Sequence, residues 1–416
     1  MKIALEIRRK RAIAVTISII VQCLLGLFLG HHYDMGIFFT VGHGVSHGVS
    51  PYGIFPSREI FKNPAFLEQL PGIGYPPPWA LYLGLVYLVL YNSTRSIFAY
   101  NLGIKLPSIL SNVILAFLVE RMAVQEGAVR KYSDKIFYFF LFNPFMIYVS
   151  AVWGQFDSFN ILVTVLALNE VYSRRIKRSS VLLALSASLK ILPFILFPLF
   201  VMFVKRNCSL RSSLEFIMTC AVSIAAFSYL PFVVFGWNPE IVFDNLGYHF
   251  NRAGGFTLFN IVELLYDQAV LPQGLELLGF VWILALVLGY YILCRTSLNK
   301  RMDLVRWSSS LSFILLLTRS WVSEQNVVML LPLVMLVTVV NFGGWRTNDL
   351  IWVNAFVFAF LNTSPFQMFF LVSPEPLAFM MKLDQSFRAL RLSLRFISVL
   401  PWQALGWSYV SRTLRH

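Results

Sequence analysis

The segment AIAVTISIIVQCLLGLFLG, residues 12–30, decides the fold class of this chain. An α-helix needs about 20 apolar residues to cross a bilayer, and this run supplies them without a charge. It lacks the short apolar region and small-residue cleavage site of a signal peptide, so we expect it to remain in the protein as a membrane span. Further apolar blocks follow near residues 76–91, 99–119, 136–152, 158–172, 181–204, 213–235, 275–294, 304–318, 326–341, 350–372 and 396–410.

The composition agrees with a bundle of such spans. Of the 416 residues, 57% are hydrophobic and 13% are charged, and the mean hydropathy is +0.69, whereas soluble domains carry roughly 25% charged residues. No polar linker divides the chain and no internal repeat is visible, so we expect a single domain over residues 1–416. The predicted fold class is all-α: a polytopic transmembrane helical bundle with about 10–12 membrane helices and a long first outer loop.

The net charge of +14 comes from short basic runs between the apolar blocks. Such runs are typical of cytoplasmic loops and speak against a nucleic-acid-binding surface, so we place the N-terminus in the cytoplasm. Arg388, Arg391 and Arg395 predict one face of an interfacial helix before the last span. The four cysteines are isolated and give no zinc or disulfide pattern. The outer segments that remain are 31–75, 236–274, 319–325 and 373–395.

The charge bias and the span count disagree between residues 76 and 212. The block 181–204 is long enough to cross once, yet basic runs flank both of its ends. It contains Lys190, Pro193 and Pro198, and proline interrupts a helix because it removes a backbone donor. A broken helix or a re-entrant hairpin is therefore an alternative to a simple span. The sequence also leaves the number of membrane spans over residues 76–157 undecided by one.

Asp34 follows the first span directly, within His31-His32-Tyr33-Asp34. A rigid helix would hold this carboxylate at the membrane–water boundary. There it is well placed to act as a general base toward an acceptor hydroxyl, beside a lipid-linked donor. The alternative is an ordinary solvated aspartate at a helix end.

The same outer segment continues with Gly48, Pro51-Tyr52 and Tyr75-Pro76-Pro77-Pro78. An aspartate after the first helix, then Gly-x-x-Pro-Tyr, then Tyr-Pro-Pro at the second helix resemble a pattern of the GT-C superfamily of membrane-embedded glycosyltransferases. These enzymes take a sugar from a polyprenyl phosphate. The resemblance runs from about residue 30 to residue 335, and it implies Asp34 as the catalytic base and Tyr75 as a substrate-binding residue.

Two more segments, residues 153–157 (WGQFD) and 190–193 (KILP), are similar to the same superfamily. They imply that Asp157 is a second acidic residue of the active-site cavity, although an aspartate between two apolar blocks also suits a helix N-cap. Lys190 lies inside an apolar block, where a charge is costly unless it is paired or hydrated. Lys190 could neutralise a donor phosphate, snorkel or form an internal ion pair, and Lys105 has the same alternatives.

A further segment, residues 248–252 (YHFNR), resembles the Tyr-His-x-x-Arg segment of the glycosylphosphatidylinositol mannosyltransferase I subgroup. It implies that Arg252 binds the donor phosphate in a bidentate manner and that Tyr248 and His249 bind substrate. The chain departs from the subgroup after Arg252, where Ala253-Gly254-Gly255 replaces further charged residues. It also carries a single Asp34 where the subgroup has a paired acidic motif.

The segment from Arg319 to Gln325 opens a late span and resembles a short outer segment of the mannosyltransferase group that ends in glutamine. The resemblance implies that Glu324 and Gln325 hydrogen-bond sugar hydroxyls. Arg319 would contact the phosphate or pair with Glu324. A plain solvated turn is the alternative.

Histidines gather in the first outer segment, where His43 and His47 are one helical turn apart. With Asp34 they could bind a divalent metal, although nearby glycines disfavour a stable helix. Phosphate recognition and plain interfacial polarity are the alternatives to a metal. We therefore predict no firm cofactor and leave a metal open.

Together these patterns predict a membrane glycosyltransferase, with mannose as the expected sugar. The donor would be a polyprenyl (dolichyl) phosphate, the acceptor a lipid-linked or glycolipid glycan, and transfer would occur with inversion on the outer or lumenal face of a plasma or endoplasmic reticulum membrane. Membrane lipids are the expected surroundings, and no nucleic acid partner is expected. Two other classes stay open: a transporter or flippase of a lipid-linked or anionic solute, and a non-catalytic membrane scaffold.

Overall fold

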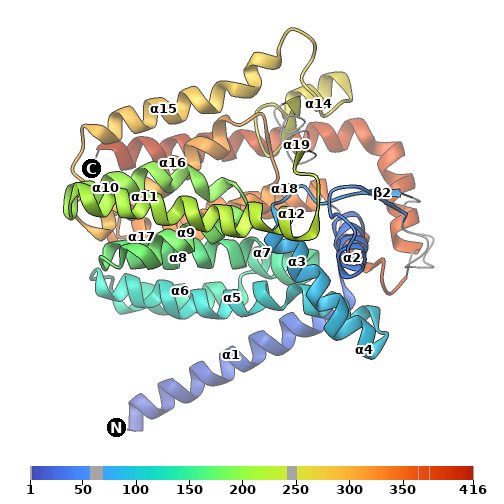
Figure 1. Ribbon diagram of the computed structural model, residues 1–416, viewed down its shortest axis with the longest axis horizontal. Coiled ribbons are helices and arrows are strands. Elements are labelled where there is room, and N and C mark those ends of the chain that lie inside the picture. Colours follow the sequence, from blue (N-terminus) through green and yellow to red (C-terminus); the bar gives the residue numbers. More distant parts are fainter. Residues whose placement is uncertain (1, 57–68, 241–250, 364, 374, 416) are drawn as a thin grey trace.

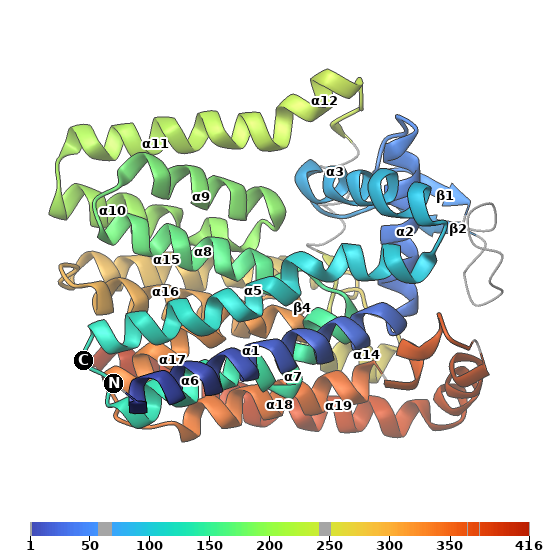
Figure 2. The same ribbon diagram turned by 90° about the horizontal axis from the view of Figure 1, so that it is seen from below.

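The computed structural model describes residues 2–56, 69–240, 251–363, 365–373 and 375–415. Its helices run roughly along one axis, and both chain termini lie at the same end (Figures 1 and 2). Within the described residues, five helices are long and apolar enough to cross a membrane: Glu6–Phe28, Ile97–Gln125, Arg130–Trp153, Leu210–Phe235 and Glu276–Cys294. The prediction of an all-α membrane bundle is confirmed.

The N-terminal part sets α1 antiparallel to α5. Arg11 of α1 binds Glu120 near the end of α5 at 2.5 Å, and Asn101 near the start of α5 donates to the Gly26 carbonyl near the end of α1 at 2.8 Å. The elements here are α1 (Lys2–Phe28), α2 (His32–Ser46), β1 (Ile54–Pro56), β2 (Gln69–Pro71), α3 (Pro77–Val86), η1 (Tyr87–Tyr91), α4 (Asn92–Thr94) and α5 (Ile97–Gln125).

The apolar block at 76–91 is not a separate crossing. It forms α3 and η1, which pack on α2 and on the first turns of α5. The Tyr82 hydroxyl donates to the Gly103 carbonyl at 2.6 Å, and the ring of Tyr87 lies 5.6 Å from that of Tyr100. Because α3 and η1 fold back on one end of α5, they add no span between α1 and α5. This accounts for the one span that the sequence left undecided over residues 76–157.

The block 181–204 is a helical hairpin. Its first helix ends at Leu189, Lys190 is extended, and the second helix begins at Phe197-Pro198. The prolines therefore interrupt the helix as predicted. The elements of this part are α6 (Arg130–Phe142), α7 (Pro144–Ile147), η2 (Tyr148–Trp153), α8 (Asp157–Tyr172), α9 (Ile176–Leu189), η3 (Leu192–Leu196), α10 (Phe197–Asn207), α11 (Leu210–Ile224), η4 (Ala225–Tyr229) and α12 (Leu230–Phe235).

The hairpin explains why basic runs flank both ends of its block. Lys177 at the start of α9 binds Glu215 of α11 at 3.2 Å. Arg206 at the end of α10 donates to the Cys294 carbonyl at 2.8 Å. Both basic runs thus lie at the end of the bundle that holds the chain termini, which we call the basic end (Figure 2). The opposite end, with α2, α3, β1 and β2, is called the site end.

The C-terminal part contains two short β contacts and a kinked last helix. Its elements are β3 (Gly254–Gly255), α14 (Asn260–Tyr266), η5 (Glu276–Phe280), α15 (Val281–Cys294), α16 (Arg301–Thr318), β4 (Trp321–Val322), η6 (Glu324–Met329), α17 (Leu331–Val340), α18 (Arg346–Asn362), η7 (Pro365–Phe369) and α19 (Glu375–Arg415). In α19, Arg395 is only 4% exposed and binds Glu263 of α14 at 2.8 Å. The prediction of an interfacial face is therefore wrong for Arg395, because an acidic residue of α14 covers it.

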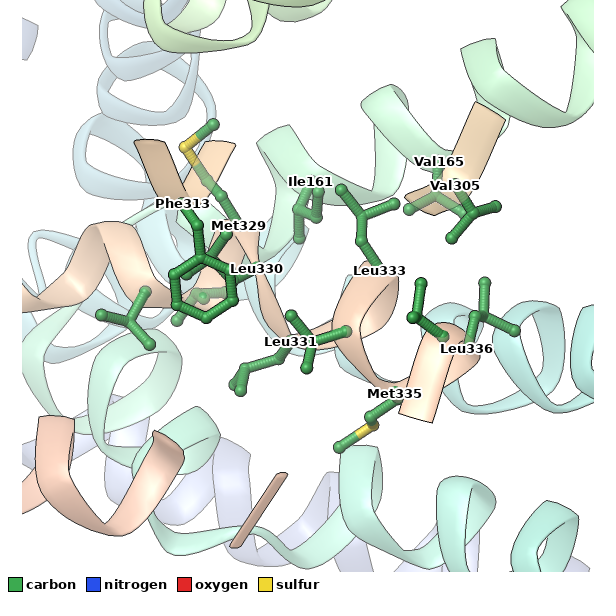
Figure 3. Packing of buried hydrophobic residues seen from close by; sticks show 14 of the residues in the cluster. Ile161, Val165, Val305, Phe313, Met329, Leu330, Leu331, Leu333, Met335 and Leu336 are labelled. Carbon is green, nitrogen blue, oxygen red and sulfur yellow. The ribbon is translucent and has the colours of Figure 1, made fainter. Parts of the chain in front are cut away.

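The centre of the bundle is α17. Every residue from Val322 to Val339 is buried, as expected for a helix that is apolar on all sides. Figure 3 shows Leu333 and Leu336 of α17 among side chains of the neighbouring helices, including Val165 of α8, Val305 of α16 and Phe313 of α16. This core holds the helices whose ends form the site.

The basic end and the site end should lie on opposite sides of a membrane. Cys208 and Cys294 are exposed at the basic end, whereas Asn238 is exposed after α12. A membrane-impermeant maleimide should therefore modify Cys208 and Cys294 from one face of a sealed vesicle. It should modify Asn238→Cys, in a protein whose Cys208 and Cys294 are replaced by serine, from the other face. Buried Cys220 is the internal control and should react only after denaturation. Labelling of Cys208 and Asn238→Cys from the same face would contradict this arrangement.

Candidate functional site

Asp34 lies in the first turn of α2, close to the end of α1. Its Oδ2 lies 3.0 Å from His31 Nδ1 and accepts hydrogen bonds from Trp153 Nε1 at 2.5 Å and Gln155 Nε2 at 2.8 Å. Burial alone would raise the pKa of Asp34, but the charge of His31 and these hydrogen bonds hold it below its ordinary value. Asp34 is therefore a carboxylate that stays ionised at neutral pH.

The WGQFD segment reaches Asp34 because Gly154 lets the chain turn. Gly154 has a φ of +99°, and a Cβ there would lie 2.5 Å from Met35 Sδ and 2.7 Å from Lys105 Cε. Only glycine fits such a backbone at such close quarters. The motif therefore orients two hydrogen-bond donors toward Asp34, a role that its resemblance to the superfamily did not disclose.

Asp157 and Lys190 form a buried ion pair. Lys190 Nζ lies 2.7 Å from Asp157 Oδ1, and Lys190 and Asp157 are 6% and 0% exposed. The ammonium also lies 5.7 Å from the ring centre of Tyr75 and 5.8 Å from that of Phe156. Of the alternatives for Lys190, the structure therefore shows the internal ion pair. Whether it also acts on a donor phosphate stays a prediction.

Tyr75 links the charged groups of the site. Burial raises the pKa of its hydroxyl, the carboxylates of Asp34 and Asp157 raise it further, and Arg252 opposes them. All three charges therefore act at the same tyrosine. The Tyr75 ring packs edge-on against Phe156, with centroids 4.9 Å apart. Three segments that are distant in sequence thus converge at the site end.

Arg252 and Arg319 approach this group from the C-terminal part. The Arg252 guanidinium stacks 3.7 Å above the Trp321 ring, at the energetically favourable range of a cation–π contact. Burial and the charge of Arg252 lower the pKa of Arg319 to about 10. The charge of Arg252 therefore acts on Arg319.

Gly254 and Gly255 make this approach feasible. They form β3, which pairs in parallel with Trp321 and Val322 of β4. A Cβ at Gly255 would overlap the Val322 carbonyl oxygen, and both glycines have positive φ. The departure from the mannosyltransferase subgroup therefore has a local reason: the glycines bring Arg252 against Trp321.

Glu324 and Gln325 are both buried within the bundle. Glu324 is 0% exposed, and it accepts hydrogen bonds from Asn362 Nδ2 at 3.0 Å and Thr363 Oγ1 at 3.3 Å. Gln325 is buried and its Oε1 has no hydrogen-bond partner among the described residues. Thus Glu324 holds the end of α18 in this structure, and sugar binding by either residue stays a prediction.

The histidines considered as metal ligands do not surround Asp34. The rings of His43 and His47 lie 4.4 Å apart at the C-terminal end of α2. Asp34 is nine residues before His43 on the same helix, a distance of about 13 Å at 1.5 Å per residue. Within the described ranges, no three His, Cys, Asp or Glu side chains gather to hold a metal. Tyr248 and His249 lie outside the described residues.

The fold is that of a polytopic membrane protein with a GT-C-like helical bundle. The structure is similar to the crystal structure of ArnT from Cupriavidus metallidurans bound to undecaprenyl phosphate, with a TM-score of 0.50 and 13% sequence identity over 96% of this chain and 77% of that chain. At this identity the likeness concerns the fold alone. Residues 46–251 match the family of the GPI transamidase subunit PIG-U. No curated protein matches the sequence.

The buried ion pair gives a direct test of the site's energetics. Lys190→Met leaves Asp157 buried without its cation, which should destabilise the protein by about 3–5 kcal/mol, whereas the double variant Asp157→Asn with Lys190→Met should recover most of the loss. Thermal unfolding in detergent measures both. The exposed pair Lys177–Glu215 is the control, since Lys177→Met should change stability by about 1 kcal/mol or less. Equal effects of Lys190→Met and Lys177→Met would contradict the assignment.

Proposed function

We propose that this protein is a glycosyltransferase of the membrane. It moves a sugar, with mannose as the first candidate, from a polyprenyl phosphate to a lipid-linked or glycolipid acceptor. The observation that carries the proposal is the carboxylate of Asp34, held by Trp153 and Gln155, whose charge acts together with that of Arg252 on the Tyr75 hydroxyl. The resemblance of the sequence motifs and the GT-C fold support it.

Asp34 is assigned the role of general base. Trp153 and Gln155 both donate to Oδ2, and His31 Nδ1 lies 3.0 Å from the same oxygen. They fix the carboxylate in one orientation and direct Oδ1 to the acceptor hydroxyl. A carboxylate with a lowered pKa is a weak base, which suits a reaction in which the hydroxyl proton leaves late, as bond formation to the anomeric carbon proceeds.

Arg252 and Arg319 are assigned to the phosphate. The donor phosphodiester carries one negative charge, and the released polyprenyl phosphate carries nearly two at neutral pH. Charge therefore develops on the phosphate during transfer, and guanidiniums placed beside it stabilise the transition state more than the donor. Lys190 is already close to Asp157, so Arg319 is the stronger partner for Arg252.

The reaction is a single displacement. Asp34 takes the proton of the acceptor hydroxyl, the acceptor oxygen bonds to the anomeric carbon, and the bond from that carbon to the phosphate oxygen breaks with its electron pair leaving on the phosphate. The configuration at the anomeric carbon is inverted. The protonated Asp34 then returns its proton to water. All bonds and protons of the displacement are accounted for by these groups.

We place the site on the outer or lumenal face. The basic end carries the runs that mark cytoplasmic loops, and the site lies at the other end of the bundle (Figure 2). This orientation sets the Asp34 carboxylate near headgroup depth, where the phosphate of a polyprenyl donor lies. A plasma membrane or an endoplasmic reticulum membrane would both suit it.

A second candidate function is a non-catalytic subunit that binds a glycolipid. The match to the family of a GPI transamidase subunit favours it. The matched segment 46–251 contains Tyr75, Asp157 and Lys190 but neither Asp34 nor the two arginines. A binding subunit needs the scaffold, whereas transfer also needs the base.

An assay of sugar transfer distinguishes a glycosyltransferase from a glycolipid-binding subunit. Purified protein in liposomes should move labelled mannose from a polyprenyl-phosphate donor to glycolipid or lipid-linked oligosaccharide acceptors, and Asp34→Asn should lower the rate by at least about 100-fold, because a positioned base contributes that much. Asp349→Asn is the matched control: Asp349 also accepts a tryptophan indole hydrogen bond, from Trp345 at 2.9 Å, but lies at the basic end. Binding of the acceptor without transfer, unchanged in Asp34→Asn, would favour the subunit instead.

The hydrogen bond from Trp153 predicts a change in pH dependence. Asp34 works as the deprotonated form and its pKa is lowered, so the activity of the native protein should persist into mild acid and fall only below the ordinary range of an aspartate. Trp153→Phe removes one bond that stabilises the charged form, so the acid limb of kcat/KM should move to higher pH. Trp345→Phe should leave the profile unchanged. Superimposable profiles for all three proteins would remove Trp153 as a partner of the base.

A further inference from the structure

Lys105 is a buried cation that the proposed mechanism does not use. It is 1% exposed and lies on α5, one turn after Asn101. The Nζ donates to the Leu29 carbonyl and, at 3.4 Å each, to the carbonyls of Gly26 and Val152. No ion pair of Lys105 with an acid is present among the described residues. The alternatives of snorkelling and of an internal ion pair therefore do not describe it.

Two of the three acceptors of Lys105, the carbonyls of Gly26 and Leu29, are ones that the end of α1 leaves open. The last turn of a helix has carbonyl groups without helical partners, and a bilayer offers no water to satisfy them. Asn101 Nδ2 donates to the Gly26 carbonyl at 2.8 Å and the Leu29 carbonyl at 2.8 Å. A cation at a helix C-terminus is also favoured by the helix dipole. Asn101 and Lys105 thus cap α1 from a neighbouring helix.

The same ammonium joins the two segments that build the base. Leu29 leads into His31 and Asp34, and Val152 leads into Trp153, which donates to Asp34. The His31 amide also donates to the Trp153 carbonyl at 3.1 Å. Lys105 therefore holds the end of α1 and the end of η2 at a fixed separation.

We propose that Lys105 is a positioning residue for Asp34. By bridging Leu29 and Val152 it keeps the Trp153 and Gln155 donors on the Asp34 carboxylate, and so it sets the protonation and the orientation of the base without touching substrate. The inference rests on the proposed function for its role in transfer, but the bridge itself is independent of that function.

The chain offers a matched control on the same helix. Asn112 is buried on α5 and donates to Gln22 of α1 at 2.8 Å and to Ser150 of η2 at 2.8 Å. It joins the same three elements as Lys105, but it lies seven residues further along α5, about 10 Å away along the axis. Replacing Asn112 loosens the same packing at a distance from Asp34.

The experiment compares Lys105→Met and Lys105→Gln with Asn112→Leu. Lys105→Met should lower kcat by about 10-fold to 100-fold with little change in the KM of the donor, since a misplaced base costs that much, and it should move the acid limb of the pH profile upward. Lys105→Gln keeps one donor and should show a smaller shift. Asn112→Leu should reduce thermal stability without moving the profile. Superimposable profiles for Lys105→Met and Asn112→Leu overturn the proposal.

Amide hydrogen exchange tests the bridge without any assay of transfer. Exchange in residues 30–36 and 154–158 should accelerate in both Lys105 variants and not in Asn112→Leu, because Lys105 binds the backbone beside both segments, whereas Asn112 binds Gln22 and Ser150 further along the helices. Unchanged exchange there overturns the inference whatever the enzyme does. If the native protein transfers no sugar while exchange responds to Lys105, the proposed function fails and the bridge stands.

Discussion

The hydrogen bonds that Trp153 and Gln155 donate to Asp34 are the contact on which the arrangement of the site depends. They join the junction of α1 and α2 to the junction of η2 and α8. Lipid offers no hydrogen bonds, so polar groups near the bilayer must find partners within the protein. At the site end this condition is met by a few long-range contacts, and each of them fixes the position of a segment far away in the sequence.

The charges of the site follow from the same constraint. Asp157 and Lys190 neutralise each other in the interior, which a bilayer protein tolerates because the pair satisfies both charges. Arg252 lies on the Trp321 ring, and its charge acts on Arg319. These guanidiniums are the groups that we assign to an anionic ligand.

The bundle and several site residues could be predicted from the sequence because both leave local patterns: apolar blocks, the prolines after Lys190 and the motif around Asp34. The partners could not, because a contact between distant segments, such as that of Arg395 with Glu263, leaves no local pattern. Hydropathy detects apolar sequence but not what covers it, so α3 resembled a span although it packs on α2 and α5. A lysine in an apolar block suggests a ligand or an ion pair, whereas Lys105 meets backbone carbonyls, which no motif records.

The limits of the family match bear on the choice between enzyme and subunit. The matched segment begins after Asp34 and ends one residue before Arg252. It therefore covers the scaffold that carries Tyr75 and the Asp157–Lys190 pair, and it excludes the groups that we assign to proton transfer and to the phosphate. A protein that kept the scaffold and lost those groups would still present that scaffold to a glycolipid. A chain can therefore share a scaffold with a transamidase subunit and still transfer sugar. The residues that flank the shared segment decide whether it is an enzyme or a binding subunit.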